Sequence, residues 1–283
     1  MLALEALTAC PLCESSNIVH LDEAFYFDRC KTCGYIFDNP RPTQAAIAEH
    51  YSRRGQYDGW LRDIDAREKL WKRRLKKMLP DRAPGSLLDV GAGIGQFLDL
   101  ARSSFSSVGG TELSESAISL AKERYGLTIH HGTIETLELP TFDNITMVHV
   151  LEHVLSPRNT LKRCFDLLNP GGRIFICVPN DIHSWRSFRS AVRARIRPNR
   201  KSPVIGLPRA EDTPEIHLSH FTSKTLSFAA RQAGFRVLKV DLDPYYVATG
   251  RKLISHHLEY AVHKLLHLPT YTCLWLVAEK PLR

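Results

Sequence analysis

Residues 87–98, with the sequence LLDVGAGIGQFL, constrain the fold of this chain more than any other stretch. The apolar run 87–90 predicts a strand that is buried on both faces of a parallel sheet. The glycines that follow predict a sharp turn into a helix, because glycine accepts strained backbone angles and lets a ligand approach closely. The start of that helix offers unpaired N–H groups to a ligand. The stretch therefore predicts an α/β fold with a ligand at the end of a strand.

The spacing of these glycines indicates which kind of ligand is bound. Asp89, Gly91, Gly93 and Gly95 follow the pattern D-x-G-x-G-x-G, whereas dinucleotide-binding proteins use G-x-G-x-x-G to hold a diphosphate. An acid at the strand end disfavours a diphosphate and suits a ligand that carries an ammonium and a carboxylate, such as S-adenosylmethionine. A tight strand–helix turn in another kind of α/β protein is the alternative that the glycines alone leave open.

A second acid supports a nucleoside ligand. Residues 107–112 read SVGGTE and predict a short strand that ends in Glu112, which lies 23 residues after Asp89. An acid about 20 residues beyond a glycine loop commonly binds ribose hydroxyls. Ser114 is the expected N-cap of the next helix. A surface glutamate without a role is the alternative, and the glycine turn upstream favours ribose binding.

Several further motifs follow in order along the chain. They are VLEHV at 150–154, LNPGG at 168–172, VPN at 178–180 and HLSHF at 217–221. Together with the glycine turn, this ordered set resembles class I S-adenosylmethionine-dependent methyltransferases over residues 87–235 and again in the last strand. It is similar to the small-molecule branch with LEHV after the fourth strand, which includes the ubiquinone-biosynthesis O-methyltransferases. The resemblance implies a doubly wound, Rossmann-like sheet of seven strands, in which strands 235–241 and 271–278 form an antiparallel pair.

The resemblance also assigns residues to the site. The loop after the third strand frames the adenine in this family, which implies Thr133 and Ile134 here. The predicted contacts to S-adenosylmethionine are Asp89, Gly91, Ala92, Gly93, Gly95, Glu112, Leu113, Thr133, Ile134 and His149.

Histidines near the end of the fourth strand are candidate catalytic bases. Ligands of doubly wound sheets bind at the carboxyl ends of the strands, and histidine titrates near neutral pH. His149 and His153 are therefore candidates, although residues 149–154 equally suit a helix start stabilised by Glu152. His217 is a third candidate, because its segment faces the substrate in similar enzymes, and a structural hydrogen bond is its alternative role. Some LEHV relatives carry an acid at the position of His149 and use a divalent metal. The histidine that replaces this acid here argues against a catalytic metal.

Four of the seven cysteines form two C-x2-C pairs near the N-terminus. Cys10 and Cys13 are separated by 16 residues from Cys30 and Cys33, a spacing typical of zinc ribbons. Four thiolates form a closed tetrahedral zinc site that has no open position for chemistry. Residues 17–21 and 25–29 predict short strands between the pairs, and so small a unit needs a metal for stability. Four reduced cysteines without a metal are the alternative.

The chain divides into three parts. We expect a zinc-ribbon-like module at 1–40, a helical linker or cap at 41–84, and the methyltransferase domain at 85–283 with insertions at about 181–214 and 245–268. The first insertion carries seven basic residues and no acid between Arg186 and Lys201. A second basic group at 69–77 predicts a solvated helix face. The helix expected within 246–268 carries an apolar stripe, which is typical of core packing or of a homodimer contact.

These patterns predict an enzyme that uses S-adenosylmethionine and holds a structural zinc. The expected reaction is O-methylation of a small acceptor, such as a sugar, a natural product or another hydroxylated compound. The basic insertion suits an acceptor that carries negative charge. An RNA base methyltransferase and a non-catalytic scaffold are the alternatives, the former because the net charge of +8 and the basic insertion suit RNA. Residues 1–9 lack the pattern of a signal peptide, and no apolar run reaches the roughly 18 residues of a membrane helix, so we expect a cytoplasmic location.

Overall fold

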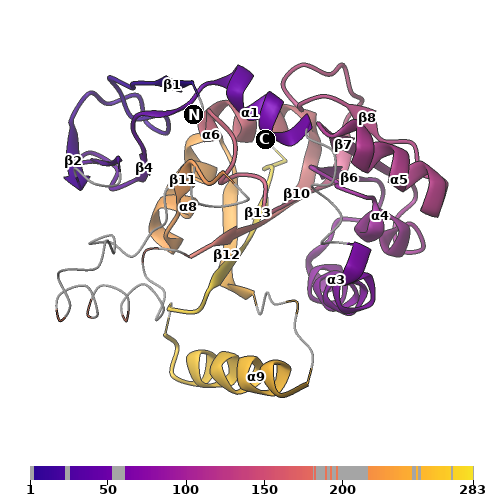
Figure 1. Cartoon of the computed structure of the whole chain (residues 1–283). Coiled ribbons are helices and arrows are strands. Elements are labelled where there is room, and N and C mark those ends of the chain that lie inside the picture. Colours follow the sequence, from indigo (N-terminus) through magenta and orange to yellow (C-terminus); the bar gives the residue numbers. More distant parts are fainter. Residues whose placement is uncertain are drawn as a thin grey trace.

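A seven-stranded sheet forms the centre of the molecule (Figure 1). The computed structural model describes residues 3–22, 26–52, 61–180, 216–243, 250–268 and 270–282, with the isolated positions 182, 189, 192, 196 and 247. The sheet has the order β12-β13-β10-β9-β6-β7-β8. Its strands are β6 (Leu87–Val90), β7 (Val108–Glu112), β8 (His130–His131), β9 (Phe142–Val148), β10 (Leu168–Pro179), β12 (Arg236–Asp243) and β13 (Cys273–Glu279).

The pairing of these strands confirms the predicted fold class. Strands β8, β7, β6, β9 and β10 are parallel to one another, and β13 lies antiparallel between β10 and β12. The first strand of this sheet along the chain is the central β6. The chain then continues outward through β7 to β8 and returns to β9 on the other side of β6. Ligands of doubly wound sheets bind where the strand order reverses in this way, which here is between β6 and β9.

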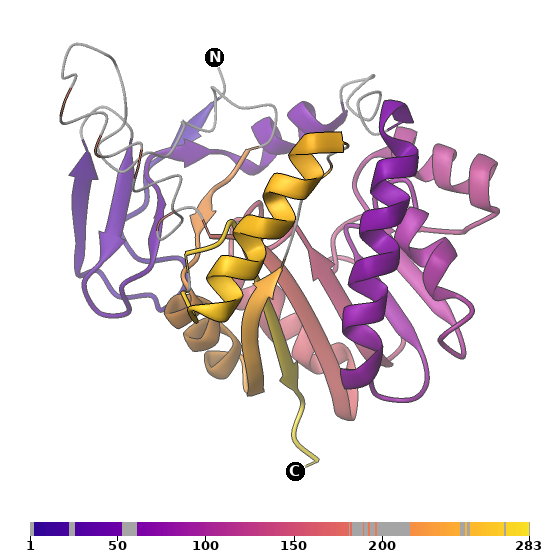
Figure 2. The same ribbon diagram turned by 90° about the horizontal axis from the view of Figure 1, so that it is seen from below.

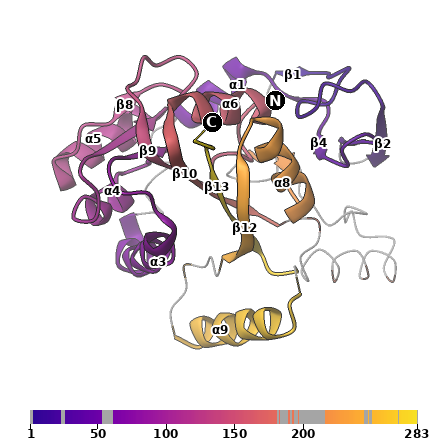
Figure 3. The same ribbon diagram turned by 180° about the vertical axis from the view of Figure 1, so that it is seen from behind.

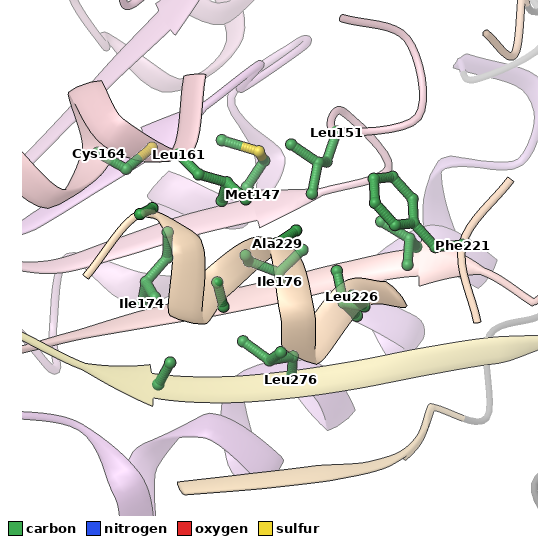
Figure 4. Packing of buried hydrophobic residues seen from close by; sticks show 14 of the residues in the cluster. Met147, Leu151, Leu161, Cys164, Ile174, Ile176, Phe221, Leu226, Ala229 and Leu276 are labelled. Carbon is green, nitrogen blue, oxygen red and sulfur yellow. The ribbon is translucent and has the colours of Figure 1, made fainter. Parts of the chain in front are cut away.

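Helices cover both faces of the sheet because its buried strands alternate apolar side chains between the faces. On β10, Ile174, Ile176 and Val178 pack against α6 (Pro157–Leu167) and α8 (Ser223–Gln232), and Figure 4 shows part of this cluster. Phe175 and Cys177 face the opposite way, toward the cluster that contains α3 (Ile64–Met78), α4 (Gln96–Ala101) and α5 (Glu115–Tyr125). Figure 2 shows α3 and α9 (Gly250–Leu265) in front of the same face.

The helix caps follow the sequence. Ser114 accepts a hydrogen bond from the Ala117 amide at the start of α5, and Ser156 caps α6 in the same way. Thr222 forms a capping box with Thr225 at the start of α8. These side chains satisfy amides that have no partner within the helix, and Ser114 is the N-cap that the sequence predicts.

Two stretches depart from regular structure. Residues 169–172 of the LNPGG motif lie within β10 as an irregularity, where the register of β10 on β9 shifts between Leu168 and Arg173. Residues 151–153 form a turn and not the helix start that residues 149–154 also suited, and α6 begins at Pro157. His149 has a φ of 57°, so the chain leaves β9 in a left-handed conformation that breaks the helical path.

A second sheet lies beside the first at the N-terminal end (Figure 1). It has the order β11-β4-β3-β2 and contains β2 (Ile18–Asp22), β3 (Phe27–Cys30), β4 (Ile36–Asp38) and β11 (Ser219–His220). Strands β1 (Leu4–Glu5) and β5 (Arg41–Pro42) form a separate pair, which leads into α1 (Gln44–Ser52). The small sheet therefore takes its last strand from a segment that is about 180 residues away in the sequence.

Helix α9 lies apart from the layers of the sheet (Figures 1 and 3). Its inner side meets the segment just before β13 through Tyr260, whose ring lies 5.4 Å from that of Tyr271. Its apolar stripe faces outward, with Ile254 61%, Leu258 63% and Leu265 78% exposed. The stripe is thus no part of this chain's own core. Among the described residues, no helix is long and apolar enough to cross a membrane.

Candidate functional site

The glycine turn after β6 takes the conformation that its sequence predicts. Gly91, Gly93 and Gly95 have φ values of 71°, 54° and 76°, which side chains on L-residues rarely permit. A Cβ at Gly91 would lie 2.5 Å from the Cγ2 atom of Val150, so only glycine fits there. A Cβ at Gly95 would meet Leu127 instead, at 2.8 Å. Gly91 therefore brings the backbone close to the loop after β9, whereas Gly95 serves packing.

Glu112 links the ends of β6 and β7. Its Oε2 atom accepts a hydrogen bond from the Gly93 amide at 2.8 Å, and its Oε1 atom accepts bonds from the amides of Leu113 and Ser114 at 2.9 Å. Three backbone donors thus hold the carboxylate in one orientation. The side chain is 9% exposed and forms part of a cavity wall. Its position at this strand end is the one expected of a group that binds ribose hydroxyls.

Asp89 is buried beneath the turn. It is 5% exposed, and its Oδ1 atom accepts a hydrogen bond from the Thr146 hydroxyl at 2.6 Å. Burial raises the pKa of Asp89 to about 7, the bond from Thr146 opposes this rise, and the charge of Glu112 adds to it. The carboxylate can therefore gain or lose a proton near neutral pH.

A cavity of about 800 Å³ opens at the switch point of the sheet. Asp89, Ala92 and Gly95 are not among its wall residues, although all three were predicted to contact the ligand. The wall that we call the glycine side follows β6, β7 and β8 and consists of Gly91, Gly93, Thr111, Glu112, Leu113, Gly132, Thr133 and Ile134. The wall that we call the histidine side lies beyond β9 and includes His149, Val150, His153, Val154, Leu155, Pro179, His217 and Cys273.

Helices α1 and α3 complete the cavity. They contribute Gln44 and Ile47 from α1, and Arg67, Leu70, Trp71 and Arg74 from α3. Two helices of the segment 41–84 thus form part of the cavity wall. Much of this wall is apolar, with a few polar groups between, as is usual for pockets that bind small molecules.

His149 has hydrogen-bond partners at both ring nitrogens. Its Nε2 atom lies 3.1 Å from a guanidinium nitrogen of Arg74, and its Nδ1 atom lies 3.1 Å from Oε1 of Glu152. Arginine can only donate, so Nε2 accepts and Nδ1 donates to the carboxylate. These contacts orient the ring and satisfy it, which suits a structural role better than that of a base.

His153 and His217 lie together on the histidine side. Their rings are 4.9 Å apart and nearly perpendicular. The Nδ1 atom of His153 donates to the carbonyl of Ile216 at 2.6 Å. Its Nε2 atom is then the ring nitrogen that can take up a proton. The structure therefore brings together two of the three predicted histidine bases.

Glu152 lies beneath these histidines and is fully buried. Burial raises its pKa, but His149, His153 and His217 lower it by more, so the carboxyl pKa lies below its usual value. The resulting negative charge favours protonation of the neighbouring imidazoles. Ligand atoms of Glu152, His153 and His217 also lie within 4.8 Å of one another, so this group could hold a cation.

Arg74 lines the cavity, although the basic group at 69–77 predicts a solvated helix face. Its side chain is 2% exposed. Its Nε and Nη2 atoms donate to Oδ2 of Asp243 at 3.1 and 2.9 Å, and its guanidinium lies over the ring of Trp71. One signal was available: Arg74 lies four residues after Leu70 and four before Met78, on the buried face of α3.

The four predicted metal ligands come together in the N-terminal sheet. The Sγ atoms of Cys10 and Cys33 are 3.8 Å apart, those of Cys13 and Cys30 are 3.5 Å apart, and all four lie within 4.8 Å of one another. Tetrahedral zinc with Zn–S bonds of about 2.3 Å needs sulfurs about 3.8 Å apart. The donor set and its spacing therefore fit a structural zinc ion.

The basic segment 186–201 lies outside the described residues except at isolated positions.

Solved structures of methyltransferases share this fold. An S-adenosylmethionine-dependent methyltransferase from Mesorhizobium loti matches with a TM-score of 0.53 and 22% identity, over 73% of this chain and 95% of that one. Magnesium protoporphyrin IX methyltransferase from Synechocystis, solved with bound S-adenosylhomocysteine, matches with a TM-score of 0.54 and 13% identity, over 83% of this chain and 98% of that one. At such identities the likeness concerns the fold alone.

Sequence relatives match over the central part of the chain. The ubiquinone biosynthesis O-methyltransferases of Coxiella burnetii and Idiomarina loihiensis are 36% and 33% identical over 101 and 108 residues. These matches cover 33% and 35% of this chain and 43% and 44% of those proteins. The chain thus spans less than half the length of these relatives. A family model described as a methyltransferase domain matches residues 64–240, and the chain therefore belongs to the methyltransferase-domain family, as the glycine turn and the ordered motifs predicted.

Proposed function

We propose that this protein transfers a methyl group from S-adenosylmethionine to a hydroxyl oxygen of a small acceptor. The observation that carries the proposal is one cavity that has Glu112 and the glycine turn on one side and the pair of His153 and His217 on the other. The family and the ubiquinone O-methyltransferase relatives support the reaction class. A cavity of about 800 Å³ suits a cofactor and a small acceptor together.

The glycine side holds the cofactor. Glu112 accepts hydrogen bonds from the ribose hydroxyls. Gly91 and Gly93 allow the amino-acid end of the cofactor to approach the backbone. Thr133 and Ile134 frame the adenine. Bound S-adenosylmethionine would supply a methyl group on a positively charged sulfur, which is already activated for transfer. The protein's main task is therefore to align the acceptor oxygen with that methyl.

The histidine side holds the acceptor. Nε2 of His153 takes the hydroxyl proton while the oxygen forms its bond to the methyl carbon and the carbon–sulfur bond breaks. Glu152 stabilises the imidazolium that results, and His217 packs against the same ring. His149 orients Glu152 through its Nδ1–H. This assignment makes His153 the base, with His217 as its partner.

We further propose that Cys10, Cys13, Cys30 and Cys33 hold a structural zinc in a module of residues 1–40, followed by the cap 41–84 and the catalytic domain 85–283. Reduced thiols suit a cytoplasmic location, where disulfides are rare. The zinc closes a unit that has little apolar core of its own, and it has no open position for catalysis.

Calorimetry and a methyl-transfer assay test the reaction. His153→Ala should keep its affinity for S-adenosylhomocysteine and lose at least about a hundredfold in transfer to hydroxylated acceptors, as expected for a general base. Gly93→Arg should lose both properties, because its side chain would enter the cavity. If the wild-type protein does not bind the cofactor, it is a scaffold rather than an enzyme.

RNA base methylation is the alternative that this assay must separate. It predicts salt-sensitive RNA binding that is lost when Arg193, Arg195 and Arg197 are neutralised. Binding that is insensitive to these changes, together with methylation of small hydroxylated acceptors, supports the proposed function.

A further inference from the structure

The segment 216–220 joins the cysteine module to the histidine side of the cavity. On one flank it forms β11, in which Ser219 pairs with Phe37 and His220 with Ile36 of β4. The Asp38 amide also donates to the carbonyl of Leu218 at 3.1 Å. The segment is therefore the last strand of the small sheet as well as the carrier of His217.

The other flank of this segment holds the turn that carries His153. The amides of Leu218 and Ser219 both donate to the carbonyl of Glu152, at 2.8 and 3.1 Å. The carbonyl of Ile216 accepts a hydrogen bond from Nδ1–H of His153. Any shift of this strand along β4 would therefore move His217 directly, and it would move Glu152 and His153 through these bonds.

Two buried side-chain pairs set the register of that strand. The Tyr35 hydroxyl donates to the Ser219 hydroxyl, with Tyr35 0% and Ser219 3% exposed. Nε2 of His220 lies 2.9 Å from Oδ1 of Asp38, and both side chains are buried. A buried polar group that loses its partner is costly. These pairs therefore favour one alignment of β11 on β4 over its alternatives.

We propose that Tyr35 and Asp38 are positioning residues that place His217 and His153 for reaction with the acceptor. Neither residue lines the cavity. They act through Ser219 and His220, and then through the backbone bonds to Glu152 and Ile216. The inference rests on the proposed function for its kinetic consequence, but the coupling itself concerns only the placement of two imidazole rings.

The cysteine cluster lies next to Tyr35 and Asp38 in the sequence. Cys30 ends β3, and its amide donates to the carbonyl of Tyr35 at 2.9 Å. Cys33 and Gly34 lead directly into Tyr35 and β4. A metal held by these thiols would thus fix the hairpin that presents Tyr35 and Asp38. The glycine side is built on β6, β7 and β8, which pair only among themselves and with β9 in the described sheet.

The test compares Tyr35→Phe and Asp38→Ala with the control Ser15→Ala. Ser15 makes an exposed hydrogen bond to Thr32 within the same module, at 2.8 Å. The pKa values of His153 and His217, and their chemical shifts, are measured by NMR titration of the protein without an acceptor. Affinity for S-adenosylhomocysteine is measured by calorimetry, and kcat and KM are measured against pH.

Both test variants should shift the titration of His153 and His217. They should also lower kcat/KM for the acceptor about tenfold, the effect of one lost hydrogen bond, and move the pH profile by the same amount as the NMR titration. Affinity for S-adenosylhomocysteine should stay within about twofold of wild type. Ser15→Ala should change none of these quantities.

Folded variants with wild-type histidine titrations would overturn the proposal, as would an equal loss of cofactor affinity, which would indicate general damage. A wild-type protein without methyl-transfer activity would refute the proposed function alone, because the NMR measurement requires no turnover.

Discussion

The glycine side and the histidine side of the cavity differ in how far apart in the sequence their residues lie. Gly91, Gly93, Glu112 and Thr133 come from successive strand ends within one continuous stretch of the chain. The histidine side combines the turn after β9 with the segment 216–220, and that segment depends on a hairpin near the N-terminus. One side is thus built by local structure, and the other by contacts between distant segments.

Because of this difference, we expect the two sides to respond to different kinds of substitution. The glycine side requires a backbone conformation that few residues adopt, so single substitutions there should act directly on the cofactor. The histidine side requires the docking of a separate small sheet, so remote changes should reach it. Arg74 ties α3, which covers the cavity, to the histidine side and to β12, because its guanidinium contacts both His149 and Asp243.

The largest expected effect is that of removing the metal from the four cysteines. Elemental analysis should find about one zinc per chain, and structural zinc contributes on the order of 10 kcal/mol to the folding of a small module. A chelator that extracts it should unfold residues 1–40 and displace the NMR signals of His153 and His217. Affinity for S-adenosylhomocysteine should fall far less. Normal folding with all four cysteines replaced by serine would contradict this prediction.

The next effect concerns the buried pair of Arg74 and Asp243. Both side chains are 2% exposed, so Arg74→Met leaves a buried carboxylate without its cation and should cost about 3–5 kcal/mol of unfolding free energy. Urea denaturation measures this loss. Lys72→Met, which removes an exposed pair with Glu68 on the same helix, should cost at most about 0.5 kcal/mol. Equal losses in the two variants would show that Arg74 is not a buried tie.

Gly91→Ala should disturb the glycine turn directly, and its Cβ would also press on Val150 of the histidine side. Gly91 has a φ of 71° and no room for a Cβ, whereas Gly126 has a φ of 64° and no atom within 4 Å of its Cβ position. Both alanines carry left-handed strain, of about 1–2 kcal/mol, but only Gly91→Ala disturbs the turn. We expect calorimetry to show a loss of about a hundredfold in cofactor affinity for Gly91→Ala, which corresponds to roughly 3 kcal/mol. Affinity should be unchanged for Gly126→Ala, and a similar loss in both would count against the turn.

A smaller effect should appear as pH dependence. Burial raises the pKa of Asp89 from 3.8 to about 7, so the folded protein retains a proton that the unfolded chain has released. The contribution of Asp89 to stability therefore decreases as the pH rises from about 4 to about 7. A ligand ammonium favours the carboxylate, so affinity for S-adenosylhomocysteine should rise about tenfold from pH 6 to pH 8. Calorimetry should show a flatter profile for Asp89→Asn, and an unchanged profile would exclude this contact.

The smallest effect should come from the outer face of α9. Leu258 is 63% exposed, so Leu258→Asn should change the unfolding free energy by less than about 0.5 kcal/mol and leave both sides of the cavity intact. Size-exclusion chromatography adds a second measurement. A wild-type dimer that becomes a monomer in this variant would identify the stripe as the predicted homodimer contact. It would contradict the expectation that the outer face of α9 has no packing partner.

The local sequence predicted the glycine side in some detail. Strand β6 has the predicted bounds, Ser114 caps the next helix as predicted, and Glu112 holds the Gly93 amide. Each of these features depends on residues close in sequence or on a recurring spacing. Asp89 was placed correctly at the strand end, but its partner Thr146 lies on another strand, and no local pattern indicates that bond.

The family, the parallel sheet, the turn that opens the cavity and the pairing of the four cysteines could all be inferred from the sequence, because glycine angles, apolar periodicity and short motif spacings are local properties. The meeting of His153 with His217, the burial of Arg74 and the extension of the N-terminal sheet by residues 219–220 depend on how distant segments pack. These contacts join segments up to 184 residues apart. They follow from the packing of one layer against another, which no single stretch of the chain encodes.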